Sequence, residues 1–159
     1  MADLCQNGSG LLLTIPTSRL TTMNSTIHYL NTDLDLISPS DLQELARAFA
    51  AAGTSPLHVT REDDGFWHAT FETDQQYAEP EPNISEMLTT IESLSEPLHN
   101  LWSTCTLREF NIGYHCGNDP WAFNQGISAG LLRRLTNAGA SIRFTLYPDR
   151  SGNVSPKST

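Results

Sequence analysis

Two short stretches in which apolar and polar side chains alternate lie on either side of a sequence typical of a turn. These stretches constrain the fold of the chain more than any other feature. Residues 57–61 and 67–71 contain β-branched and aromatic side chains, and Asp63-Asp64-Gly65 lies between them. A three-residue loop that contains glycine is typical of a β-hairpin. We therefore expect Glu62 to pair with Phe66, with the glycine in the left-handed conformation.

This register predicts a hairpin with one largely apolar face and one polar face. The facing pairs on the apolar side are Leu57 with Phe71, Val59 with Ala69 and Arg61 with Trp67. The polar face carries His58, Thr60, His68 and Thr70. A slip of one residue would mix the two sets of side chains, so the pattern itself favours this register.

Helix signals lie on both sides of the hairpin. Before it, Ser38 precedes a proline and can cap a helix whose apolar spacing continues until Gly53. After it, apolar residues recur at helical spacing over residues 84–102, where Pro97 interrupts them. The stripe keeps its phase across the proline, which favours a kinked, nearly continuous helix over a second helix capped by Ser95.

The remaining segments complete an alternating order of elements. The patterns predict strands over residues 26–34, 107–114 and 141–147 and a helix over residues 128–138. The last strand has an inward set and an outward set of side chains. We expect Ile142, Phe144 and Leu146 to point inward.

The order β-α-β-β-α-β-α-β predicts an α+β fold. Its first six elements match the split βαβ arrangement of ferredoxin-like folds. A right-handed crossover through the last helix would place the final strand parallel to the strand that begins at Leu107. We expect a single two-layer domain with a ferredoxin-like core, an extra helix and strand, and all helices on one face of the sheet.

The patterned region predicts one α+β domain over residues 23–148, between a flexible N-terminal extension (1–22) and a disordered C-terminal tail (149–159). Residues 1–22 have no clear period, so Met23 is an alternative to Met1 as the natural start. The first residues lack the basic start and the apolar run of about 7–15 residues that a secretory signal needs. Three cysteines form no disulfide framework, which favours reduced thiols and a cytoplasmic protein.

The net charge and the hydropathy of the chain argue against a nucleic-acid partner and a membrane partner. Nine basic residues stand against 18 acidic ones, a formal net charge of −9. Binding to a phosphate backbone depends on concentrated Lys and Arg, so we expect no nucleic-acid partner. No window approaches the roughly 18 apolar residues of a membrane span, so we expect no membrane partner.

The most site-like stretch connects the strand over 107–114 to the helix over 128–138. It brings together a thiol, an imidazole, a carboxylate, an amide and aromatic rings, on Tyr114, His115, Cys116, Asn118, Asp119, Trp121 and Phe123. Exposed aromatic rings of this kind are typical anchors of protein interfaces, although they also pack loops onto domains. One alternative is an enzyme or small-molecule site with Cys116 as the nucleophile. His115 is poorly placed to activate it, because adjacent strand residues point to opposite faces.

The hairpin offers a second alternative, a metal site. His58 and His68 are diagonal neighbours on its polar face. Two imidazoles are too few for tetrahedral zinc, and solvent-facing polar side chains are ordinary on such a sheet. We therefore expect no metal and no cofactor, and these two histidines remain the alternative.

The pattern from residue 107 to 148 resembles a known group of domains. The pattern Ile-Ser-x-x-Leu-Leu-x-x-Leu is matched by Ile127-Ser128, Leu131-Leu132 and Leu135. Further along the chain come a glycine stop in Ala138-Gly139-Ala140-Ser141 and a final strand that contains Tyr147. In these features, over roughly a quarter of the chain, the segment resembles small uncharacterised bacterial domains of unknown function. The resemblance implies a bacterial origin and an α+β architecture. It implies no catalytic residues, because the group has no established activity to transfer.

The leading functional hypothesis is a small acidic bacterial protein that binds another protein and catalyses nothing. No complete catalytic set of residues emerges from the sequence, and the aromatic loop supplies a contact surface. Acidic domains steer basic partners electrostatically, as inhibitors and toxin immunity proteins do. We therefore expect an unidentified protein partner with a basic surface.

Overall fold

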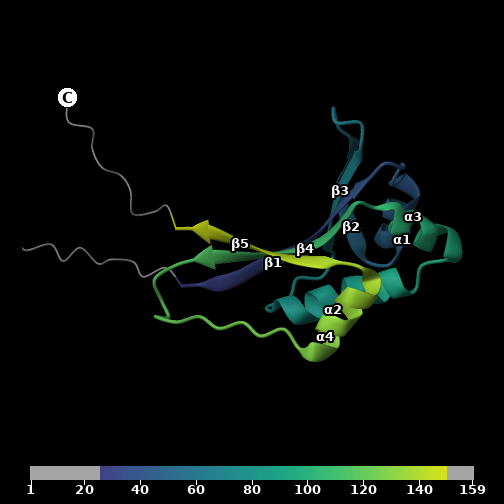
Figure 1. Ribbon diagram of the computed structural model, residues 1–159. Helices are drawn as coiled ribbons and strands as arrows, with labels where there is room; N and C mark the ends of the chain where they lie inside the picture. Colours follow the sequence, from purple (N-terminus) through teal and green to yellow (C-terminus); the bar gives the residue numbers. More distant parts are fainter. Residues whose placement is uncertain (1–25, 150–159) are drawn as a thin grey trace, which may run out of the picture.

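The computed structural model describes residues 26–149 and forms one five-stranded sheet with four helices (Figure 1). The predictions for residues 1–22 and for the tail beyond Asp149 lie outside the described residues, as does Cys5. The elements are β1 (His28–Ser38), α1 (Gln43–Ala51), β2 (Thr54–Arg61), β3 (Trp67–Thr73), α2 (Pro80–Glu92), α3 (Glu96–Thr104), β4 (Leu107–Cys116), α4 (Ala129–Ala138) and β5 (Ser141–Pro148).

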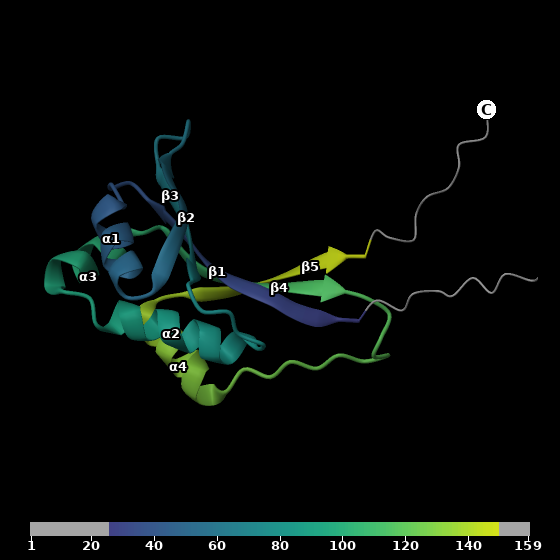
Figure 2. The ribbon, with the colours of Figure 1, turned by 180° about the vertical axis from the view of Figure 1, so that it is seen from behind.

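The sheet is mixed, and its strand order is β2-β3-β1-β4-β5. The pairs β2–β3, β3–β1 and β1–β4 are antiparallel, whereas β4 and β5 are parallel, as the crossover through α4 predicts. The helices lie on one side of the twisted sheet, and no helix within residues 26–149 lies over the other side (Figures 1 and 2). The predicted two-layer α+β architecture is therefore confirmed.

The core lies between the helices and the sheet face that they cover, which we call the inner face. Strand side chains alternate between the two faces, so every second residue of the central strands is buried. The fully buried strand residues include Leu34, Leu36, Phe71, Phe110 and Ile112. The helices cover them with Leu45, Phe49, Ile84, Met87, Leu88, Ile91, Trp102, Leu131 and Leu135.

The hairpin turn forms as predicted. The amide of Glu62 donates to the carbonyl oxygen of Phe66 over 2.9 Å, and Gly65 has φ +84°. The pairs Val59–Ala69 and Arg61–Trp67 are also found.

The predicted pair of Leu57 with Phe71 is wrong. Pro56 faces Phe71, and the register of β2 shifts between Pro56 and His58. The extra residue is Leu57, which is 54% exposed, whereas Phe71 is fully buried. A bulge of one residue moves the bulged side chain out of the regular alternation, so Leu57 lies outside the core.

The predicted start of the first helix is also wrong. Ser38 is the last residue of β1, where it is buried and pairs with Trp67, and α1 begins at Gln43. The hydroxyl of Ser38 instead accepts a hydrogen bond from the amide of Ser40, and the Asp41 carboxylate accepts one from Gln43. Strand pairing therefore uses the residue that local capping rules would assign to the helix.

The apolar stripe over residues 84–102 forms two helices, not the favoured single kinked one. The alternative is correct, because α3 has Ser95 at its N-cap and Pro97 in its first turn. Residues 26–149 therefore form four helices where the sequence predicts three. No helix among residues 26–149 is long and apolar enough to cross a membrane.

Candidate functional site

The candidate loop runs from the end of β4 to the start of α4 and is fixed at both ends. Near its start, the carbonyl oxygen of Asp119 accepts a hydrogen bond from the amide of Ile27 over 2.7 Å, and the Asp119–Pro120 peptide bond is cis. At its end, the hydroxyl of Ser128 caps α4, and both Ser128 N and Ser128 Oγ donate to the carboxylate of Glu81 on α2. The loop is therefore attached at one end to Ile27, the residue just before β1, and at the other end to α2.

Between this loop and the inner face of β4 and β5 lies a groove with a volume of about 460 Å³. Its lining is mostly apolar. We call it the apolar groove, and its residues are Ile27, Tyr114, Cys116, Phe123, Gln125, Phe144 and Leu146. The helix layer does not extend over this part of the sheet, and Phe144 and Leu146 are 55% and 64% exposed. The last strand thus has the predicted facing, but two of its inward side chains remain uncovered.

The two aromatic rings of the loop have different environments. The ring of Phe123 packs edge-on against Tyr114, with 5.3 Å between the ring centroids. The side chain of Trp121 is 98% exposed. Phe123 therefore holds the loop against the sheet, whereas Trp121, two residues earlier in the same loop, does not pack onto the domain. Asn118 and Asp119 are exposed near it.

Tyr114 supplies the one phenol in the groove. Its side chain is only 3% exposed, and its hydroxyl has no hydrogen-bond partner among the described residues. Burial raises the pKa of Tyr114 to about 12, with a smaller contribution from Tyr29. The phenol therefore stays neutral near pH 7 and places no negative charge in the groove.

His115 and Cys116 lie on opposite faces of the sheet, as their adjacent positions predict. Cys116 is half-buried in the apolar groove. His115 faces the other side, where its ring stacks on His28 with 5.1 Å between centroids. The structure therefore does not bring this imidazole to the thiol. Of the sequence-predicted residues, Tyr114, Cys116 and Phe123 meet in the groove, and His115 does not.

The two hairpin histidines share the uncovered face of the sheet, which we call the outer face. His58 and His68 line a shallow hollow of about 150 Å³ together with Asp35 and Arg143. Nε2 of His68 lies 2.9 Å from Oδ2 of Asp64. Across residues 26–149, no group of three or more His, Cys, Asp or Glu side chains is arranged to hold a metal ion.

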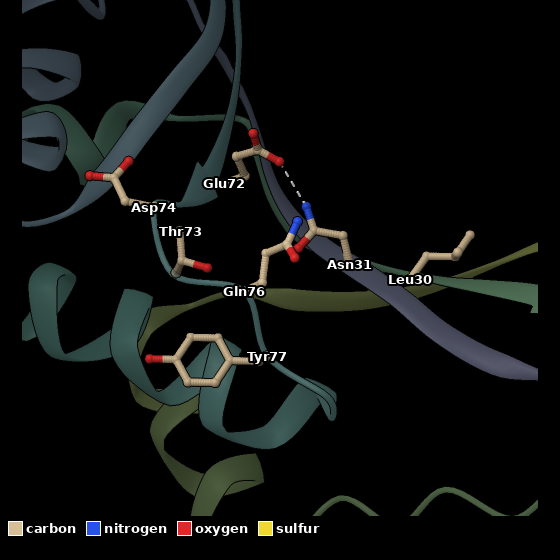
Figure 3. A pocket seen from close by; sticks show the side chains of 7 residues that line it. All are labelled: Leu30, Asn31, Glu72, Thr73, Asp74, Gln76 and Tyr77. Carbon is tan, nitrogen blue, oxygen red and sulfur yellow. Dashed lines mark hydrogen bonds between the residues drawn. The ribbon is translucent and has the colours of Figure 1, made fainter.

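Another pocket lies beside the β-bulge of β1, between Asn31, the end of β3 and the segment that leads to α2, and has a volume of about 420 Å³ (Figure 3). Asn31 and Glu72 meet there, and the amide nitrogen of Asn31 donates to the carboxylate over 2.9 Å. Asp33 lies next to this pair. Its pKa is raised to about 6 by burial and by the nearby carboxylates of Asp35 and Glu72.

Sequence reasoning missed several residues of these sites. The apolar groove is lined in part by Ile27, Phe144 and Leu146. Along the last strand, the alternation of apolar and polar side chains is the same whether or not helices cover the apolar face, so the sequence does not reveal the groove. The β-bulge near Asn31, beside which the 420 Å³ pocket lies, had no signal in the sequence beyond the imperfect alternation of the first strand.

Comparisons with protein-family models, curated proteins and solved structures give no match for this chain. The resemblance of residues 107–148 to small bacterial domains therefore stays a prediction. A fold alone does not determine a function, which depends on the residues of the site.

Proposed function

We propose that this chain is a small, non-catalytic, acidic module that binds a basic protein partner through the apolar groove and the adjoining loop. The single observation that carries the proposal is the side chain of Trp121, which is 98% exposed in the same loop whose Phe123 and Gln125 line the apolar groove. Tryptophan is among the residues that contribute most to protein interfaces, where an apolar surface around it excludes water. Trp121 is therefore the proposed anchor.

The groove supplies the surroundings that such an anchor needs. Phe144 and Leu146 form its sheet side, and Phe123 forms part of its loop side. An apolar side chain of the partner can enter beside Trp121 and remove these surfaces from water, at about 25 cal/mol per Å² of apolar area.

The chemistry of the partner follows from charge. A net charge of −9 attracts a basic surface at long range and raises the rate of encounter. This combination supports an inhibitor-like or immunity-like role, in which an acidic domain covers a basic protein. A bacterial origin and a cytoplasmic location belong to the same proposal.

The test is affinity capture with the full chain, followed by measured affinities of the captured partner for variants. Trp121→Ala should weaken binding by about 30-fold, the minimum expected of an interface hot spot. Phe123→Ala should also weaken it, because the loop loses its packing on Tyr114.

A matched control is Phe66→Ala at the hairpin tip, since Phe66 is 37% exposed and Phe123 is 39% exposed. This variant should bind as the wild type does, and added NaCl should slow association. Unchanged affinity after both loop substitutions would eliminate this interface. A captured small molecule in place of a protein would also overturn the proposal, in favour of a ligand-binding groove.

A further inference from the structure

The two edge strands of the sheet differ in whether their backbone can pair with a further strand. At one edge, β2 carries Pro56 and the bulge at Leu57, and both features interrupt the pattern of backbone donors and acceptors. At the other edge, β5 pairs with β4 in one unbroken register over all eight residues. Within residues 26–149, no strand pairs with the second side of β5.

The side chains of β5 also lack the usual protection of an edge. Phe144 and Leu146 are more than half exposed on the inner face. In an acidic chain, β5 contains no carboxylate, and its single charged residue, Arg143, forms an ion pair with Glu109 of its own neighbour β4. No two carboxylates would therefore face each other across a pair of β5 strands, so the paired strands themselves add little charge repulsion.

We propose that β5 of one copy pairs with β5 of a second copy in antiparallel orientation, about a two-fold axis at Thr145. In this register Phe144 faces Leu146 of the second copy on the inner side, and Arg143 faces Tyr147 on the outer side. The strand is therefore complementary to itself, which is what a two-fold interface requires. The two sheets become one continuous sheet, and both exposed apolar side chains gain a cross-strand neighbour.

This self-association goes beyond the proposed function and leaves its anchor free. Trp121 belongs to the loop after β4 and not to the β5 edge. Each copy keeps its own loop, and the grooves of the two copies lie on the same side of the joined sheet. A dimer therefore offers a partner two docking loops.

The experiment uses the position on the axis, where a substituted residue meets its own copy. T145K and T145E each place two like charges opposite one another, and both variants should be monomers of 17.5 kDa where the wild type has twice that mass. A mixture of T145K and T145E should restore the dimer, because opposite charges then face each other. T60K, an outer-face substitution on the β2 edge, should leave the dimer intact. Masses are measured by light scattering, and circular dichroism confirms that each variant is folded.

Three results would overturn the proposal: a monomeric wild type at the highest attainable concentration, a dimer that survives both substitutions, or a mixture that stays monomeric. Partner binding provides a separate readout. T145K and T145E should still bind the partner through Trp121, whereas Trp121→Ala should still dimerise, so failure of one proposal is distinguishable from failure of the other.

Discussion

The ring of Tyr147 lies against Gly113, and its Cε2 atom is 3.4 Å from the position that a Cβ at Gly113 would occupy. Gly113 is in the middle of β4, and Tyr147 is on the parallel strand β5. The missing side chain leaves room for the phenol ring to cover the backbone of β4, which compensates for the weak packing of a glycine in a strand.

Gly113→Val should therefore displace the ring of Tyr147 and loosen β5. We expect a loss of about 1–3 kcal/mol in the free energy of unfolding, measured with urea, because the added methyl groups overfill this contact. Gly113→Ala should have a smaller effect, since its Cβ only reaches the limit of ordinary contact. The control is Gly126→Ala, where no atom lies within 4 Å of the new Cβ. A Val variant as stable as the wild type would show that the ring does not depend on this glycine.

Arg134 joins α4 to α2. Its guanidinium donates to both carboxylate oxygens of Glu92, to the hydroxyl and carbonyl oxygens of Ser85, and to the hydroxyl of Thr89. We expect Arg134→Met to cost about 1–2 kcal/mol in unfolding free energy, because several charge-assisted hydrogen bonds are lost from a partly exposed site. The neighbouring Arg133 is exposed, so Arg133→Met should cost far less. Equal losses in the two variants would show that the contacts across the helices contribute little.

The raised pKa of Asp33 predicts an unusual dependence of stability on pH. Its folded value of about 6 lies above the unperturbed 3.8, so the folded protein holds this proton more tightly than the unfolded chain. Asp33 therefore stabilises the fold increasingly as pH falls from 7 through 6 towards 4. The lowered pKa values of Asp64, Glu81 and Glu92 act in the opposite direction, at lower pH.

Asp33→Asn should make the protein more stable at pH 7 and should remove most of the gain between pH 7 and pH 5. Urea unfolding at these two pH values measures both effects. Asp63→Asn at the exposed hairpin tip makes the same change in charge and is the control for that change. An Asn variant that keeps the wild-type gain on acidification would assign that gain to another group.

The two described cysteines should react at different rates with iodoacetamide. Cys105 is 4% exposed, and burial raises the pKa of its thiol, so less thiolate is available for alkylation. Cys116 is half-buried and lines the open groove. In a Cys5→Ser background, mass spectrometry should find Cys116 modified in the native protein and Cys105 modified only after unfolding. A bound partner should protect Cys116, and faster reaction of Cys105 would contradict the burial argument.

Local chemistry predicted the hairpin turn correctly because the signal and the structure lie within a few residues. Gly65 is required at a position with positive φ, and Glu62 and Phe66 are close enough in the chain to pair whatever surrounds them. The bulge at Leu57 has no such signal. A one-residue insertion depends on which strand packs beside β2, and that is a tertiary property.

Long-range pairing also explains the misplaced helix start. Ser38 and the proline after it meet the local requirements of a helix cap. However, β1 stays paired with β4 as far as Ile37 and with β3 as far as Ser38, which is buried and pairs with Trp67, so Ser38 belongs to the strand. At residues 84–102 the phase of the apolar stripe indicates which side faces the core. It does not determine whether the backbone stays helical across Pro97.

The candidate site could be predicted in its residues but not in its form. Trp121, Phe123, Tyr114 and Cys116 stood out because reactive and aromatic side chains gather between two elements. The groove itself depends on where the helix layer ends. The alternation of side chains along β5 indicates which face each side chain points to, but it does not indicate whether a helix covers that face. Phe144 and Leu146 therefore read as core residues while more than half of each side chain is open to solvent.

The position of β1 between β3 and β4 gives the domain a single mechanical centre. β1 is hydrogen-bonded to β3 on one side and to β4 on the other. The β2–β3 hairpin and the β4–β5 pair therefore cannot separate from each other while β1 stays paired with both. Opening of β1 breaks both ladders together. Its amides around Leu34 and Leu36 should then be the last to exchange with deuterium, at the rate of global unfolding.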